Sequence, residues 1–188
     1  MRRVPLRERK FDFVFLAFLV INATVVTYII DVEQLIIRDP ANFTYPVWPP
    51  AFFVDLIHWW GETYDPLLLA RPPFWRMTIW IDIIFFGPFY FFAIYAFIRG
   101  RDWIRVPALV WSGTMMANVL IILMDEYYGV TPAKNFLVVL GANATWLLMP
   151  FLMIWRMRRD QPFHEPLPPF PDDTAPPAAN PPAAAVAA

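Results

Sequence analysis

Two aspartates stand within or beside apolar segments that are long enough to cross a membrane. Asp82 lies inside the apolar run that begins at Trp75, and Asp31 ends the first apolar run of the chain. A carboxylate in lipid costs several kcal/mol unless it is neutral, paired or hydrated, so an ionisable group in such a run indicates a functional site. We therefore ask whether these two carboxylates form one site.

Polar side chains recur at a similar depth in the other apolar runs. Asp82 is seven residues from Trp75, which places it roughly 10 Å inside its helix at 1.5 Å per residue. Asn118 in the third run and Asn143 in the fourth lie at a comparable distance from the same side. This agreement predicts a pocket in the outer half of the bundle. The alternative is that the asparagines only join helices through hydrogen bonds.

The chemistry of a pocket with two aspartates is constrained. If Asp31 and Asp82 face each other in a space of low dielectric constant, they cannot both ionise cheaply, and the pair carries about one negative charge. Such a site favours a ligand with a large apolar body and a cationic or hydroxyl group, since aromatic faces also attract cations. The expected walls are Trp80, Phe85, Phe86, Trp111, Met115 and Trp146.

Four apolar segments must position these residues. The chain has 188 residues, of which 59% are hydrophobic and 16% charged, as is typical of a membrane protein. Each segment is long enough to cross about 30 Å of hydrocarbon as a helix. The sequence predicts an all-α integral membrane protein, a four-transmembrane-helix bundle with helices near Phe13 to Ile30, Trp75 to Ile98, Val106 to Met124 and Phe136 to Trp155.

The distribution of basic residues predicts the orientation of the bundle. Eleven of the 15 lysines and arginines lie before the first helix, between the second and third, or after the fourth. Both termini are therefore expected in the cytoplasm. The apolar loop between the first two helices is then exterior or lumenal, with a short interfacial helix near Pro50 to Gly61. Residues 1–159 form the predicted membrane domain, and the Pro/Ala-rich residues 160–188 a disordered cytoplasmic tail.

Composition also disfavours several classes of site. A net charge of -1 without a basic patch argues against a nucleic-acid partner. The chain has no cysteine and only two histidines, His58 and His164, far apart in sequence. We expect no metal site and no cofactor.

Several stretches resemble one family. The sequences "YDPLL", "AIYAFIRGRDWIRVP", "TYIIDVEQLI" and "ATWLLMPFLMI" are similar to the sigma-2 receptor branch of the EXPERA superfamily, whose founding member is a sterol isomerase, the emopamil-binding protein. The resemblance covers about Phe13 to Arg158. It implies that the protein binds a sterol-like lipid or hydrophobic amines and forms a homodimer. The Pro/Ala-rich tail has no counterpart in the family, and its composition suits a bacterial source, for which we expect a hopanoid-like lipid as the ligand. The resemblance also implies an endoplasmic-reticulum-type membrane in a eukaryote or the cytoplasmic membrane in a bacterium.

The resemblance assigns roles to individual residues. Asp31 matches the aspartate that pairs with cationic ligands, and Asp82 stands where the family has a glutamate that hydrogen-bonds this aspartate. Asp65 matches an aspartate that organises the exterior loop, while Asn118 and Trp146 match positions that line the pocket. The chain departs from the family at Ala23 and Phe86, which replace a histidine and a glutamine, and at Asp82, which is shorter than glutamate.

Three functions remain open from the sequence. The first is a lipid-binding protein whose ligand is held by Asp31, Asp82, Asp65, Asn118, Trp146, Trp111, Met115 and Phe86. The second is a sterol or polycyclic-lipid double-bond isomerase, similar to the Δ8-Δ7 isomerase, in which Asp82 donates a proton and Asp31 stabilises the cation or removes a proton. The absence of a histidine from the apolar runs favours binding. The third is a structural subunit of a larger membrane complex.

Overall fold

Four long helical rods form the body of the protein, for which a computed structural model describes residues 1–167. The first rod comprises α1 (Asp12–Ile21), η2 (Asn22–Asp31) and α2 (Val32–Ile36), and the second comprises α5 (Pro73–Ile81), η3 (Asp82–Phe86) and α6 (Gly87–Arg99). The third is α7 (Arg105–Tyr128), entered through the short 3-10 turn η4 (Asp102–Ile104), and the fourth is α8 (Phe136–Arg156). All four are long and apolar enough to cross a membrane, which confirms the predicted fold class.

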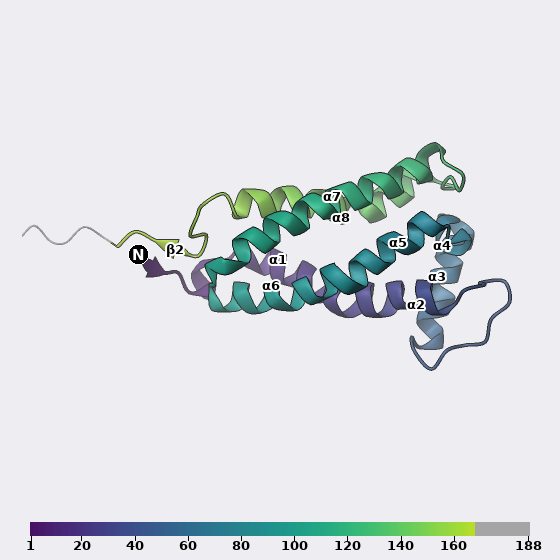
Figure 1. Cartoon of the computed structure of the whole chain (residues 1–188), viewed down its shortest axis with the longest axis horizontal. Helices are drawn as coiled ribbons and strands as arrows, with labels where there is room; N and C mark the ends of the chain where they lie inside the picture. Colours follow the sequence, from purple (N-terminus) through teal and green to yellow (C-terminus); the bar gives the residue numbers. More distant parts are fainter. Residues whose placement is uncertain (168–188) are drawn as a thin grey trace, which may run out of the picture.

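The rods are arranged as two packed pairs. Helix α7 runs along α8, while α1 and η2 run along α6 (Figure 1). At one end of the bundle lie α3 (Ala51–Thr63) and α4 (Leu67–Ala70), together with the loop after α2; we call this the α3 end. Helix α3 is the short helix expected near Pro50 to Gly61, extended by two residues. It crosses the rods near their ends (Figure 1), and its interfacial location stays a prediction.

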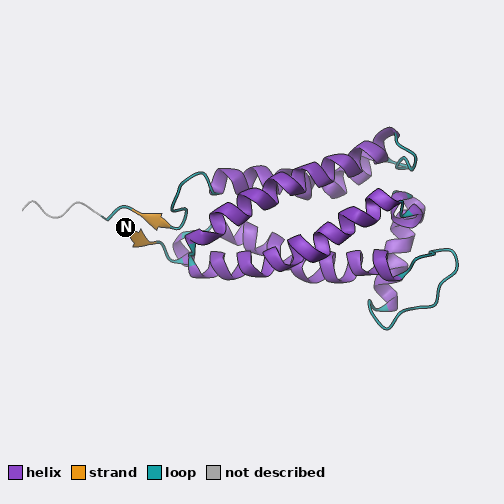
Figure 2. Cartoon of the chain, in the orientation of Figure 1, coloured by secondary structure: helices purple, strands orange, loops and turns teal. Residues whose placement is uncertain are grey.

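The opposite end holds both ends of the described chain. Strand β1 (Arg2–Arg3) pairs antiparallel with β2 (His164–Glu165), and the 3-10 turn η1 (Leu6–Glu8) leads into α1 (Figure 2). Phe163 is fully buried, packs on the ring of Phe97 and lies beneath the guanidinium groups of Arg9 and Arg156. The prediction of disorder from residue 160 is therefore wrong for 160–167. The rest of the predicted tail lies outside the described residues.

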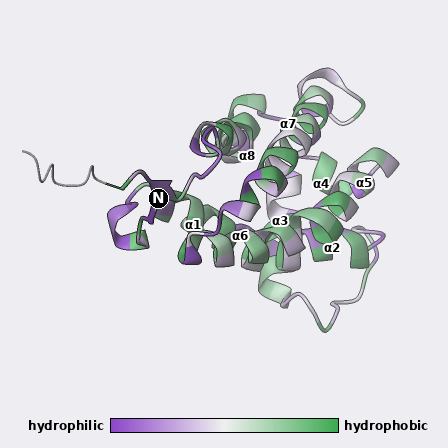
Figure 3. Cartoon of the chain, turned by 60° about the vertical axis from the view of Figure 1, so that its left-hand side comes forward, coloured by the Kyte–Doolittle hydropathy of each residue, from purple (hydrophilic) through white to green (hydrophobic). Residues whose placement is uncertain are grey.

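Apolar side chains cover the outside of the rods. Between 22% and 39% of each spanning window is buried inside the protein, so most of it faces outward, and hydrophilic residues gather near the strands (Figure 3). Trp80 and Phe85, expected as walls of the pocket, are 46% and 66% exposed and point outward. That expectation was wrong, because an aromatic side chain is equally compatible with lipid and with a protein interior.

Two π-helical segments, η2 and η3, interrupt the α-helical rods at Asp31 and Asp82. In η3 the N–H of Gly87 donates to the carbonyl of Asp82, five residues earlier, instead of four. Pro88 has no N–H, so the regular ladder cannot continue there. Such π segments occur often at functional sites. A Cβ on Gly87 would lie 3.0 Å from the Thr27 methyl group and the Tyr28 hydroxyl, so glycine lets the first two rods approach closely.

Candidate ligand cavity

A cavity of about 550 Å³ opens at the α3 end, between η2, α3, α5, α7 and α8. Its volume falls in the range of small-molecule sites, roughly 300–1,000 Å³. The structure brings six of the eight predicted ligand-binding residues to its lining: Asp31, Asp82, Asp65, Asn118, Met115 and Trp146. Most of the remaining lining is aliphatic or aromatic, and Asn143 is also present.

The other two predicted residues lie elsewhere. Phe86 and Trp111 belong to the packed core of the bundle and do not line the cavity. Trp111 stacks on Phe89 with ring centroids 5.3 Å apart and an interplanar angle of 14°, and Phe86 contacts the edge of the same indole. These rings belong to the packed core and not to the cavity lining, a distinction that the apolar sequence of both helices does not indicate.

Asp31 and Asp82 meet on the cavity wall. Both are buried, and their carboxyl groups lie within hydrogen-bonding reach of each other. Thr27 donates its hydroxyl to Oδ1 of Asp82 at 2.5 Å. Among residues 1–167, no lysine, arginine or histidine forms an ion pair with either aspartate. The two carboxyl groups therefore face an apolar cavity without a cationic side chain to pair with.

Hydrogen bonds fix the aromatic wall opposite. Nε1 of Trp146 donates to Oδ1 of Asn22 at 2.8 Å, and Nδ2 of Asn22 donates to the carbonyl of Phe18. The indole is thus held between α8 and η2 with its ring lining the cavity. Asn143 donates to the carbonyl of Val139 within its own helix at 3.0 Å, so it joins no other helix through this bond.

Two further acidic residues, Asp65 and Glu126, line the cavity. Asp65 accepts a hydrogen bond from the N–H of Leu67 at 3.2 Å, and burial raises the pKa of the Asp65 carboxyl to about 6. Beside it lies Glu126, which the sequence analysis missed. Glu126 stands two residues before the end of α7, where a carboxylate usually reaches water, so only its burial distinguishes it.

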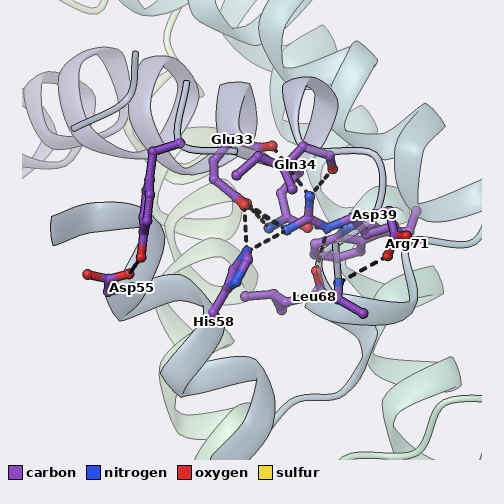
Figure 4. Close-up of polar contacts among 11 residues, drawn as sticks. Glu33, Gln34, Asp39, Asp55, His58, Leu68 and Arg71 are labelled. Atoms are coloured by element: carbon purple, nitrogen blue, oxygen red, sulfur yellow. Dashed lines mark hydrogen bonds and ion pairs between the residues drawn. The ribbon is translucent and has the colours of Figure 1, made fainter. Parts of the chain in front are cut away.

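A buried ion-pair network supports the cavity wall from behind. Nη2 of Arg71 lies 2.8 Å from both carboxylate oxygens of Glu33, and Nε2 of His58 lies 2.9 Å from Oε1 (Figure 4). Gln34 donates to Oε2 of Glu33 at 2.6 Å and accepts from Nε1 of Trp75, a lining residue, at 2.9 Å.

The backbone conformation at Arg71 places its guanidinium in this network. Its φ of 47° turns the chain between α4 and α5, and its guanidinium also donates to the carbonyl of Ile37. The network thus ties α2, α3, α4 and α5 together. No local sequence pattern indicates it, because its hydrogen-bonded members lie up to 41 residues apart. Within the described ranges, no group of three or more histidine, aspartate or glutamate side chains could hold a metal ion.

Comparison with known proteins places this geometry in a family. Residues 52–157 match the family model of EXPERA, the EXPanded EBP superfamily. The Sigma intracellular receptor 2 of Xenopus tropicalis is 30% identical over 126 residues, which cover 59% of this chain and 74% of that protein. The Homo sapiens protein of the same name is 29% identical over 124 residues, covering 58% and 70%. The chain is therefore an integral membrane protein that belongs to the EXPERA superfamily, in its sigma-2 receptor branch.

Proposed function

We propose that the protein binds a sterol-like lipid or a hydrophobic cation in the cavity, with Asp31 holding the polar or cationic end of the ligand and Asp82 supporting Asp31. The observation that carries this proposal is the pair of adjacent, buried carboxyl groups without a cationic partner among residues 1–167. A cationic ligand supplies the missing charge, and the apolar lining covers its body.

Binding of a hydrophobic tertiary amine to the purified protein in mild detergent tests the proposal. Asp31→Asn keeps the shape of the side chain and removes its charge, so we expect a loss of affinity of at least about 30-fold, the lower range for a buried charge pair. Asp39→Asn is the matched control, because Asp39 is exposed at the same end and only accepts from the N–H of Ala41. Equal affinity of Asp31→Asn and the parent protein would contradict the proposal.

A second candidate, a lipid double-bond isomerase, uses the same site. It is favoured by the hydrogen bond from Thr27 to Asp82, which orients one carboxyl group next to another in a cavity able to hold a polycyclic lipid. Asp82 then donates a proton to an alkene carbon, and the cation is held by Asp31 and the indole of Trp146. The Asp31 carboxylate accepts a proton from a neighbouring carbon as the shifted alkene forms, and transfer of this proton to the adjacent Asp82 restores the starting state.

Incubation with a Δ8 sterol in deuterated water separates the two candidates. An isomerase incorporates deuterium into a product with a shifted alkene, and Asp82→Asn abolishes this incorporation. A preparation that binds the amine yet incorporates no deuterium is a binding protein. Mass spectrometry of the extracted sterol reads out both results.

The topology and assembly are proposed with the function. We propose that the α3 end is exterior or lumenal, that both termini are cytoplasmic, and that the protein is a homodimer in the membrane. Asn42, in the sequence "NFT", is exposed in the loop after α2 and is a glycosylation acceptor in a lumenal location. Expression in microsomes should give one glycan that Asn42→Gln removes. Gel filtration with light scattering should give a dimer, whereas an obligatory larger complex would favour a structural subunit.

A further inference from the structure

The cavity has a second acidic pair, formed by Asp65 and Glu126, away from Asp31 and Asp82. Glu126 is 1% exposed and lines the cavity, and no N–H, hydroxyl or cationic group among residues 1–167 donates to its carboxyl oxygens. The carboxyl of Asp65 lies within hydrogen-bonding reach of the carboxyl of Glu126, so the two acids can share one proton. A shared proton satisfies only part of the acceptor capacity of two carboxyl groups, and buried polar groups in native proteins are nearly always hydrogen-bonded, so the pair still lacks a donor.

The surroundings of Glu126 offer no cation. Asp125, its neighbour in sequence, turns away to accept from the hydroxyl of Thr131 and the N–H of Val130. Lys134 donates to the carbonyl of Glu62 instead. No salt bridge joins Glu126 to any other side chain of the described chain. A ligand in the cavity can supply the donor or cation that the Asp65 and Glu126 pair lacks among residues 1–167.

The two acidic pairs are separated along the bundle. Helix α5 begins and α7 ends at the α3 end, and the deep residue Asp82 follows Pro73 by nine positions while Glu126 precedes Tyr128 by two. At 1.5 Å per residue these positions lie roughly 13 Å and 3 Å from the helix ends, a difference of about 10 Å along the axis. Apolar side chains, including Ile122 and Ile79, line the space between them.

We propose that the ligand is two-headed: an apolar body that carries an amine or alcohol at each end, one held by Asp31 and Asp82 and the other by Asp65 and Glu126. This inference rests on the proposed function, because it assumes that the cavity binds an apolar ligand at the first pair. It adds that the cavity selects for length and for a second hydrogen-bond donor.

The test compares two probes of the same apolar body, a hydrophobic monoamine and the corresponding diamine with nitrogens about 10 Å apart. The parent protein should bind the diamine at least about tenfold more tightly. Glu126→Gln should bring the ratio of the two affinities, diamine to monoamine, from about tenfold to about one. Glu62→Gln is the matched control, since Glu62 is exposed at the same end and lies outside the cavity lining.

Each outcome decides a different claim. Equal binding of the two amines by the parent protein, or an advantage of the diamine that survives in Glu126→Gln, overturns the inference and leaves the proposed function intact. Failure of the parent to bind either amine refutes the proposed function and the inference with it. If Glu126→Gln does not fold, Asp65→Asn replaces it, and the comparison of probes in the parent needs no variant.

Discussion

Buried carboxylates at the two ends of the bundle differ in whether they have a cationic partner. At the end of the bundle that holds β1 and β2, which we call the strand end, Asp12 accepts hydrogen bonds from Nε of Arg156 at 2.6 Å and from Nη2 at 3.0 Å. Asp12 also forms an ion pair with Arg9. In the cavity, Asp31 and Asp82 are comparably buried and face each other without a cation among residues 1–167. A neutralised carboxylate holds helices together, whereas an unneutralised one in an apolar cavity is available to a ligand.

The α3 end itself also contains a buried carboxylate that has a cationic partner. Glu33 lies only two residues after Asp31, yet it is paired with Arg71 and His58 and points away from the cavity. Depth in the bundle therefore does not decide the role of an acidic residue here. The presence of a guanidinium partner does.

The largest expected effect is on stability at the strand end. Asp12→Asn leaves Arg9 and Arg156 without their common carboxylate, and breaking a buried pair in this way costs about 3–5 kcal/mol of unfolding free energy. Chemical unfolding in detergent measures it. Asp160→Asn is the control, because Asp160 is 96% exposed and its ion pair with Arg105, whose side chain is 30% exposed, lies at the surface. Similar stability of the two variants would mean that the strand end does not depend on its ion pairs.

A pH effect is expected at Asp65 in the cavity lining. The pKa of Asp65 is raised by burial from 3.8 to about 6, so the native state binds its proton more tightly than the unfolded chain does. The resulting stabilisation is fully present below about pH 4 and is lost as pH rises through about 6, by an amount of up to about 3 kcal/mol. Asp65→Asn should therefore show a weaker fall of the melting temperature between these values. Parallel melting curves for parent and variant would contradict this.

A smaller effect is expected at the deep pair. Asp82→Ala removes the acceptor of the fully buried Thr27 hydroxyl and should lower the unfolding free energy by about 1–3 kcal/mol. The same variant should also lower the affinity for the amine. Asp82→Asn keeps an acceptor and should retain most of the stability. A neutral effect of Asp82→Ala on both measurements would remove Asp82 from the site.

The smallest effect is expected at an exposed pair near the strands. Arg2 and Glu8 are 3.2 Å apart with side chains 55% and 41% exposed. Solvent screening makes such pairs weak, so Arg2→Ala should change the unfolding free energy by less than about 1 kcal/mol. A loss as large as that of Asp12→Asn would show that the contrast rests on something other than burial.

The sequence predicted the elements well because hydrophobic length carries that information. The four spans, the short helix before the second of them and the depth of Asp82 all follow from runs of apolar residues. It did not predict which aromatic residues face the cavity, because Trp80, Phe85, Phe86 and Trp111 lie in helices that are apolar on every side.

Long-range partners were invisible for a different reason. Glu126 looks like an ordinary helix end until the fold buries it beside Asp65, and Glu33 meets Arg71 only through the fold. The order of residues 160–167 depends likewise on Phe163 reaching a site formed by Phe97, Arg9 and Arg156. No local pattern encodes contacts between segments this far apart in the chain.

The π-helical segment η3 has a consequence for how such a protein can diversify. A π segment accommodates one extra residue in a helix, and inserting or removing a residue rotates the helix on one side of it by about 100° relative to the other. In the second rod, α5 carries part of the cavity wall on one side of η3, and α6 carries core residues on the other. A single insertion or deletion there can re-aim the ligand-facing half while the packed half keeps its neighbours, so descendants could change what they bind without rebuilding the bundle.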